Sequence, residues 1–283
     1  MENDITRRDF VTMSVAAGLA AAAGTDLSAQ QQVVETNVAI KTADGTCDAA
    51  FLHPASGARP AVVIWPDAFG LRPSMRDIAR RLAAEGYSVL VPNPFYRVEK
   101  APVFEDASNF NFGDTTQRAK LTPLMGSINA AGTVEKDAPA FVAWLDSQPQ
   151  VDKTKKIGTQ GYCMGGALVV RTAAAVPDRI GAGGSFHGGG LVTQQPTSPH
   201  LLAPKIKARM YFGIAANDDM SQPDAKTKIK ESFEAAKVPV EVEVYPMAQH
   251  GWCVPDMPNN LYAKADAERA WSKLVALYKA ALS

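Results

Sequence analysis

One short segment, residues 156–175, constrains the fold of this chain more than any other. It begins with a strand-like run, Lys156 to Gln160, and ends with a helix-like run, Met164 to Ala175. Between them lies Gly161-Tyr162-Cys163-Met164-Gly165, a Gly-x-Cys-x-Gly sequence. A turn this sharp leaves no room for bulk two residues to either side of its centre, so both positions need glycine. The segment therefore predicts a strand, a strained turn that carries Cys163, and a helix.

The rest of the chain alternates strand-like and helix-like runs in the same way. The first two strands are expected to form a hairpin around Asp44-Gly45. Residues 95–128 mix aromatic, Asn, Asp and Gly residues, and we expect an irregular lid there. Strands are expected at 33–42, 47–53, 61–65, 87–91, 156–160, 180–186, 208–214 and 240–245, and helices at 73–85, 134–147, 164–175, 224–237 and 261–282. This order predicts an α/β fold, a mostly parallel central sheet with helices on both faces.

The N-terminus carries an export pattern. Thr6-Arg7-Arg8-Asp9-Phe10-Val11 is a twin-arginine sequence, and the apolar run Val15 to Ala23 follows it. That run is too short and too weakly hydrophobic for a membrane span. We therefore expect residues 1–30 to be a signal peptide and residues 31–283 to be one exported, periplasmic domain.

Composition excludes several classes of function. Lys+Arg and Asp+Glu both number 29, so the formal net charge is zero and no electrostatic footprint for nucleic acid or an anionic membrane exists. Three cysteines are too few for a disulfide scaffold, and Cys47 and Cys253 are expected to be free thiols. No metal-ligand spacing and no dinucleotide-binding fingerprint is present. We expect no cofactor or metal, a small-molecule substrate, and a monomer.

Cys163 is expected to be a nucleophile. The helix that begins at Met164 directs its free N–H groups and its dipole at the sulfur, which favours the thiolate. The turn is the Gly-x-Ser-x-Gly elbow of α/β-hydrolases with Cys in place of Ser, and in that fold the acid and the histidine follow the nucleophile. His250 lies in a loop bounded by Pro246 and Gly251, after the strand at 240–245. We expect His250 to be the base.

The elbow resembles that of the dienelactone hydrolases, also called carboxymethylenebutenolidases. The resemblance runs from about Pro60 to the C-terminal helix, motif by motif and in order. It implies the α/β-hydrolase fold and hydrolysis of small esters or lactones. The segments that carry it are Gly161-Tyr162-Cys163-Met164-Gly165-Gly166, Trp65-Pro66-Asp67-Ala68-Phe69-Gly70-Leu71, Pro92-Asn93-Pro94-Phe95-Tyr96-Arg97 and Gln249-His250-Gly251-Trp252.

The resemblance also implies the acid. It should follow the strand at 208–214, in Asn217-Asp218-Asp219. Counting from the strand favours Asp218, whereas counting back from Pro223 favours Asp219; we choose Asp218. Together with Cys163 and His250 it would form a triad that acts through an acyl-thioester.

Further pocket residues follow from position and from the resemblance. The oxyanion hole is expected to use the N–H groups of Met164 and, by resemblance, Ala68. Asp67 matches a family glutamate that holds the resting thiol, but its side chain is one methylene shorter. His187 ends a strand, so we expect it to face the pocket. Phe69 and Trp252 belong to the matching segments and are expected to contact substrate.

Arg97 matches a family arginine that binds a substrate carboxylate. A second family arginine, shortly after the catalytic histidine, is missing, and Trp252-Cys253-Val254 occupies that stretch. We therefore expect weaker anion recognition and a more apolar pocket. Three other functions compete with hydrolysis: acyl transfer, ligand binding without turnover, and thiol redox chemistry. No resolving cysteine lies near Cys163, which disfavours the last.

Overall fold

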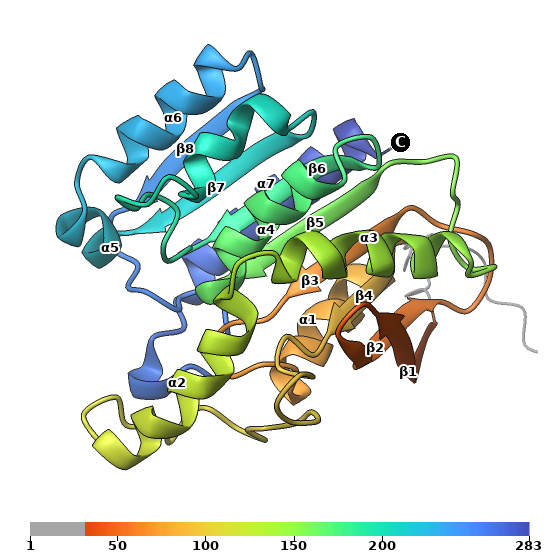
Figure 1. Cartoon of the computed structure of the whole chain (residues 1–283), viewed down its shortest axis with the longest axis horizontal. Coiled ribbons are helices and arrows are strands. Elements are labelled where there is room, and N and C mark those ends of the chain that lie inside the picture. The colour runs from red at the N-terminus through yellow and green to blue at the C-terminus, as the bar shows by residue number, and fades with distance from the viewer. Residues whose placement is uncertain (1–31, 283) are drawn as a thin grey trace, which may run out of the picture. The chain divides into compact units, whose positions relative to one another are not determined.

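The computed structural model describes residues 32–282, which form an eight-stranded sheet in the order β1-β2-β4-β3-β5-β6-β7-β8 (Figure 1). β1 pairs with β2, and β2 with β4, in antiparallel register, and all other neighbours are parallel. The predicted α/β-hydrolase fold is confirmed. The expected signal peptide lies outside the described residues. The strands are β1 (Val33–Thr42), β2 (Gly45–Pro54), β3 (Ala61–Trp65), β4 (Ser88–Pro92), β5 (Ile157–Tyr162), β6 (Ile180–Phe186), β7 (Arg209–Ala215) and β8 (Val240–Tyr245).

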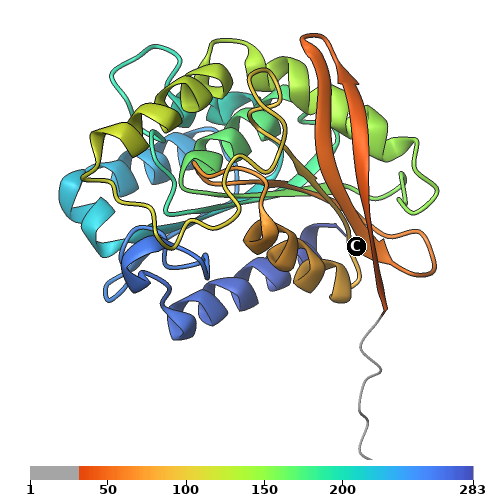
Figure 2. The same cartoon turned by 90° about the horizontal axis from the view of Figure 1, so that it is seen from below.

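Helices cover both faces of the sheet (Figure 2). α1 (Pro73–Ala84) and α7 (Lys264–Ala281) pack on one face, and α3 (Thr133–Asp146), α4 (Met164–Ala175) and α6 (Ala225–Ala235) on the other. The strands are buried on both sides because alternate residues point to opposite cores: in β3, Val62 and Ile64 face α1, whereas Val63 and Trp65 face α3 and α4. Nowhere in residues 32–282 does a helix combine the length and apolarity required to cross a bilayer.

The segment expected to be an irregular lid contains a helix, which corrects that prediction. α2 (Thr115–Asn129) begins after Asp114, whose carboxylate accepts hydrogen bonds from the N–H groups of Thr116 and Gln117. Pro123 inside the helix and its polar composition hid the helical pattern. A short helix after β7, α5 (Ala216–Ser221), was also not expected. Residues 32–282 also contain two 3-10 turns, η1 (Pro199–Lys205) and η2 (Pro258–Asn260).

All three cysteines are free thiols. Cys47 belongs to the core beneath α3 and α4, whereas Cys253 packs against the opposite core. A disulfide also needs side chains that point towards each other, and side chains in the cores on opposite faces of the sheet do not.

Candidate active site

The turn between β5 and α4 has the strained geometry that its glycines predict. Cys163 lies at φ 52° and ψ −114°, outside the regions that L-residues ordinarily occupy. A Cβ at Gly161 would lie 2.2 Å from the carbonyl oxygen of Gly165, and a Cβ at Gly165 would lie 2.3 Å from that of Trp65. Gly161 therefore allows β5 to approach α4, and Gly165 allows α4 to approach the end of β3, only because both positions lack side chains.

His250 and Asp218 meet beside this turn, although they come from different strands' ends. Nδ1 of His250 lies 2.9 and 3.0 Å from the two carboxylate oxygens of Asp218, which stands in α5. The backbone N–H of His250 donates to Oδ1 of Asn217 at 2.8 Å, which holds the loop after β8 against α5. Asp219 instead forms an ion pair with Lys226 at 2.7 Å. Of the two neighbouring aspartates, the structure brings Asp218 to the imidazole.

The surroundings of His250 favour its protonated form. Burial acts to lower the pKa of His250, but the hydrogen bond to Asp218 and the negative charges of Asp218 and Cys163 raise it to about 10. Cys163 and His250 line the same cavity. This arrangement can hold an imidazolium between a carboxylate and a thiolate.

Two N–H groups near the sulfur are free to bind an oxyanion. Met164 is the first residue of α4, so its N–H has no partner within the helix. The N–H of Ala68 makes no hydrogen bond within the described part of the chain, and Ala68 lines the cavity with Cys163. These are the two N–H groups that the sequence analysis expects to form an oxyanion hole.

Asp67 is bound in a way that its family position does not predict. Its two carboxylate oxygens accept hydrogen bonds from Arg72 at 2.7 and 3.0 Å, and one also accepts the N–H of Phe69 at 2.9 Å. Arg72, whose side chain is fully buried, binds Asp256 on its other side through two contacts of 2.7 Å. Asp67 lines the cavity but makes no hydrogen bond to Cys163 among the described residues. Sequence reasoning missed Arg72, because nothing local distinguishes a buried arginine from an exposed one.

His187 lies behind the elbow and does not line the cavity, which corrects that expectation. It is fully buried at the end of β6, with φ 40°, and its Nδ1 accepts the N–H of Cys163 at 3.1 Å. Its proton is therefore on Nε2. Burial and the nearby His250 hold the pKa of His187 well below its usual range, so it is neutral.

Trp252 also supports the cavity wall from behind. It is fully buried, and its ring centre lies 5.1 Å from that of His187 and 4.8 Å from that of Tyr245. It is not among the residues that line the cavity. The expectation that Trp252 contacts substrate is therefore corrected: Trp252 packs behind the cavity wall.

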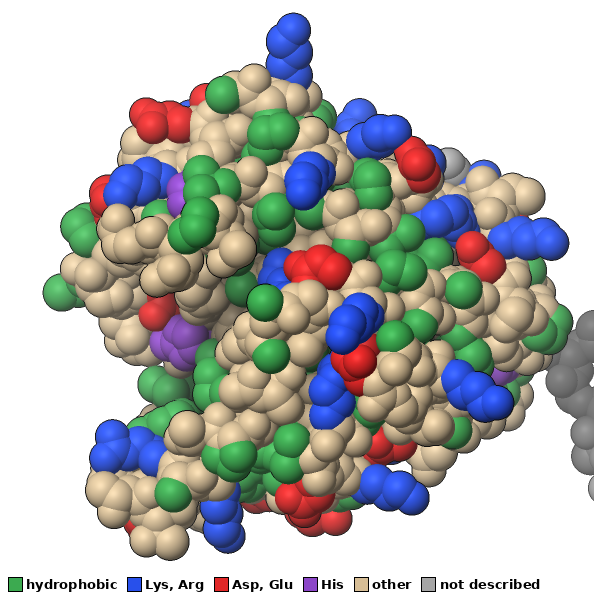
Figure 3. All heavy atoms as spheres, viewed as in Figure 1, with side chains coloured by type: hydrophobic (Ala, Val, Ile, Leu, Met, Phe, Trp, Pro, Cys, Tyr) green, Lys and Arg blue, Asp and Glu red, His purple; other side chains and the backbone are tan. Residues whose placement is uncertain are grey.

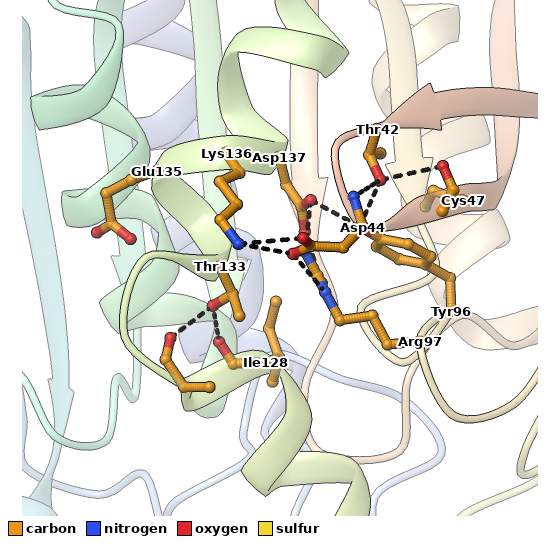
Figure 4. Close-up of polar contacts among 12 residues, drawn as sticks. Thr42, Asp44, Cys47, Tyr96, Arg97, Ile128, Thr133, Glu135, Lys136 and Asp137 are labelled. Atoms are coloured by element: carbon orange, nitrogen blue, oxygen red, sulfur yellow. Dashed lines mark hydrogen bonds and ion pairs between the residues drawn. The ribbon is translucent and has the colours of Figure 1, made fainter.

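Arg97 lies outside the cavity, in a polar cluster between the β1–β2 turn and α3 (Figure 4). Its guanidinium donates to the buried carboxylate of Asp137 at 2.7 and 2.9 Å and to Asp44 at 2.9 Å. A buried carboxylate needs a counter-charge, and Arg97 supplies it to Asp137. The expected role in binding a substrate carboxylate is therefore corrected to a structural ion pair.

The cavity has a volume of about 340 Å³ and a largely apolar wall. Phe69 lines it, as expected, and α2 contributes Leu121 and Met125; Figure 3 shows hydrophobic side chains around the hollow beside α2. A second cavity of about 190 Å³, between α1 and α7, contains neither Cys163 nor His250. Within residues 32–282 no three His, Cys, Asp or Glu side chains gather as metal ligands would. The larger cavity is lined by Asp67, Ala68, Phe69, Phe112, Leu121, Met125, Cys163, Asn217, Gln249, His250, Met257 and Leu261.

Comparison with known proteins relates this site to one family. The profile of the dienelactone hydrolase family matches residues 47–282. A carboxymethylenebutenolidase-like protein from Synechocystis sp. is 29% identical over 235 residues, which cover 81% of this chain and 89% of that protein. The carboxymethylenebutenolidase of Rhodococcus opacus is 25% identical over 239 residues, 83% and 87% of the two chains. A dienelactone hydrolase-like structure from Klebsiella pneumoniae has a TM-score of 0.74 at 21% identity and covers 88% and 99%.

Proposed function

Because the chain belongs to the dienelactone hydrolase family, we propose that it hydrolyses small esters or lactones with Cys163, His250 and Asp218 as its triad. One observation carries the proposal. His250 shares a cavity with Cys163 at a strained elbow, and its far nitrogen lies 2.9 Å from the Asp218 carboxylate. This is the nucleophile, base and orienting acid that acyl transfer requires.

The first half of the reaction acylates the sulfur. The Cys163 thiolate attacks the substrate carbonyl, and the resulting oxyanion is bound by the N–H groups of Met164 and Ala68. When the tetrahedral intermediate collapses, the C–O bond breaks and the leaving alkoxide takes the proton of the His250 imidazolium. The products of this half are an acyl-thioester and an alcohol, and His250 is neutral. In a lactone the alcohol remains tethered to the acyl group.

The second half regenerates the thiolate. Acylation removes the negative charge of Cys163, one of the causes that raise the pKa of His250. The neutral imidazole then takes a proton from water while the oxygen attacks the thioester. The C–S bond breaks, the acid leaves, and the thiolate–imidazolium pair returns. Asp218 holds the tautomer that exposes Nε2 to the reactants.

Kinetics of matched variants test the proposal. We expect Cys163→Ala to abolish hydrolysis of p-nitrophenyl acetate, and iodoacetamide to inactivate the parent. Asp218→Asn should lower kcat by about 100-fold or more, because the imidazole loses its orienting partner. Asp219→Asn, which disturbs only the Lys226 pair, and Cys47→Ala should retain activity.

Mass spectrometry of the parent during turnover should detect an acyl adduct on the peptide that contains Cys163. Full activity in Cys163→Ala would refute the proposal. Ligand binding without turnover in the parent would indicate a binding protein on this fold, and product formation only with an added alcohol or amine would indicate an acyltransferase.

We propose in addition that residues 1–30 direct export of the folded domain to the periplasm and that the domain is monomeric. The Arg7-Arg8 pair and the apolar run after it support export. Replacing both arginines with lysine should retain the protein in the cytoplasmic fraction. Size-exclusion chromatography checks the oligomeric state.

A further inference from the structure

We infer that this cavity selects uncharged substrates with apolar acyl groups and rejects acyl groups that carry a carboxylate. The inference rests on the proposed function, because it concerns substrates of the same site. It differs from what the family resemblance implies, since the matching arginine, Arg97, would have served a substrate carboxylate. Three observations on the described residues carry it.

The first is the composition of the wall. Neither Lys nor Arg occurs among the cavity-lining residues of the described chain. Apart from the reacting groups and Asp67, the polar side chains are the amides of Asn217 and Gln249. Phe69 and Phe112 belong to an aromatic cluster with Phe110, which makes this side of the cavity apolar. A substrate carboxylate inside the cavity would therefore meet no lysine or arginine side chain.

The second observation concerns Arg72, an arginine that binds the cavity-lining residue Asp67 and is not free to bind a substrate anion. Arg72 has five N–H donors, and all are occupied. Nε and one N–H of Nη2 bind Asp256, and the other N–H of Nη2 binds Asp67. Nη1 donates to Asp67 at 2.7 Å and to the carbonyl of Gly70 at 3.3 Å. To bind a substrate anion, Arg72 would have to leave a carboxylate unpaired.

The third observation is the balance of charge in the ion-pair cluster of Asp67, Arg72 and Asp256 beside the cavity. Asp67 and Asp256 bring two negative charges against the single positive charge of Arg72. The charge of a protonated His250 is already shared between Asp218 and Cys163. An incoming anion is therefore repelled as well as desolvated, and burial of an unpaired carboxylate is strongly unfavourable.

A pair of esters of equal shape tests the inference. p-Nitrophenyl 5-methylhexanoate carries an isopropyl group where the mono-p-nitrophenyl ester of glutarate carries a carboxylate, so the two esters have the same number of non-hydrogen atoms and differ in charge. With the uncatalysed rates subtracted, we expect kcat/KM for the uncharged ester to be about 100-fold higher or more, because the buried carboxylate lacks a partner. Equal values for the two esters would overturn the inference.

A cation introduced into the wall should reverse the preference. Leu121, a buried residue of α2, lines the cavity. Leu121→Arg should raise the ratio of kcat/KM for the anionic ester to kcat/KM for the uncharged ester about 10-fold or more. The matched polar control Leu121→Gln should leave this ratio unchanged. An equal increase of this ratio in both variants would mean that side-chain polarity or size, not positive charge, sets the preference, which would contradict the inference.

Alkylation separates failure of this inference from failure of the proposed function. N-propylmaleimide and 3-maleimidopropionic acid have similar size but differ in charge, and they react with Cys163 without any hydrolysis. Relative to free N-acetylcysteine, we expect Cys163 to react at least 10-fold faster with the uncharged reagent, measured on its peptide by mass spectrometry. Faster reaction with the uncharged maleimide, without ester turnover, would refute the proposed hydrolase function but not the preference of the cavity for uncharged ligands. Ester turnover without any preference would refute the substrate class alone.

Discussion

At the scale of single residues, the position of the Cys163 sulfur depends on two glycines that have no side chain. Gly161 and Gly165 allow β5, α4 and the end of β3 to approach within distances that no Cβ tolerates. The contacts are with backbone carbonyls, which move only if a strand or helix moves. The two glycines of the local sequence pattern are therefore required by contacts between β5, α4 and the end of β3.

Gly165→Ala should be strongly destabilising for this reason. Its Cβ would lie 2.3 Å from the oxygen of Trp65 and 2.7 Å from that of Pro66. We expect a loss of about 2–3 kcal/mol in the free energy of unfolding, measured by urea denaturation. Gly189→Ala is the control, because nothing lies within 4 Å of its Cβ and it should be nearly neutral. Equal effects at the two positions would contradict the steric explanation.

The raised pKa of His250 makes a pH-dependent contribution to stability. Its value of about 10 in the folded state exceeds the ordinary value of 6.5. The protonated imidazole therefore stabilises the fold fully below about pH 6.5, and this contribution is lost as the pH rises towards 10.

Asp218→Asn removes a cause of that raised pKa. The difference in urea midpoint between the parent and this variant should be largest near pH 6 and should shrink towards pH 10. Asp219→Asn, whose carboxylate binds Lys226, should differ from the parent by an amount that does not change between pH 6 and 8. A constant difference for Asp218→Asn across the whole range would argue against a pair with His250.

At the scale of elements, α2 is the helix whose presence most affects the cavity. It contributes Leu121 and Met125 to the wall, and Asp114 satisfies two N–H groups at its start. Most of its other residues are polar, so the helix depends on this cap and on a narrow apolar side. Loss of the cap at the N-terminus of α2 should therefore alter the cavity wall that Leu121 and Met125 form.

Asp114→Ala should loosen this helix. Loss of an N-cap costs about 1 kcal/mol, and we expect faster amide hydrogen exchange in residues 115–129 together with a higher KM and little change in kcat. Asp114→Asn should behave like the parent, because asparagine caps equally well. Unchanged exchange in Asp114→Ala would mean that packing alone maintains α2.

At the scale of the whole molecule, Arg72 joins two walls of the cavity that are far apart in the chain. It connects the loop after β3, through Asp67, with the loop after His250, through Asp256, which is 184 residues away. Both loops carry atoms that the proposed reaction uses. The relative position of Ala68 and His250 therefore depends on a buried charge.

Arg72→Met should cost about 3–5 kcal/mol in the free energy of unfolding, because a buried carboxylate loses its partner. Adding Asp67→Asn and Asp256→Asn removes the unpaired charges, so the triple variant should be more stable than the single variant when both are compared by urea denaturation. If the triple variant is the less stable of the two, steric fit rather than charge explains the role of Arg72.

Much of the fold follows from local pattern. The hairpin, the apolar strand at Ala61–Trp65, the helix at Met164–Ala175 and the glycine elbow were predicted because periodicity and steric limits act within a few residues. α2 was missed because Pro123 and its polar residues weaken that periodicity. The family resemblance and the motif order identified the fold class.

The sequence by itself determined the α/β alternation, the strained turn beneath Cys163 and the order of candidate reacting groups. Tertiary structure alone decided that Asp218 rather than Asp219 contacts His250, that Arg97 pairs with Asp137, and that Arg72 is fully occupied between Asp67 and Asp256. The physical reason is range. Sterics and periodicity act between neighbours, whereas the partner of a buried charge is set by the packing of distant segments.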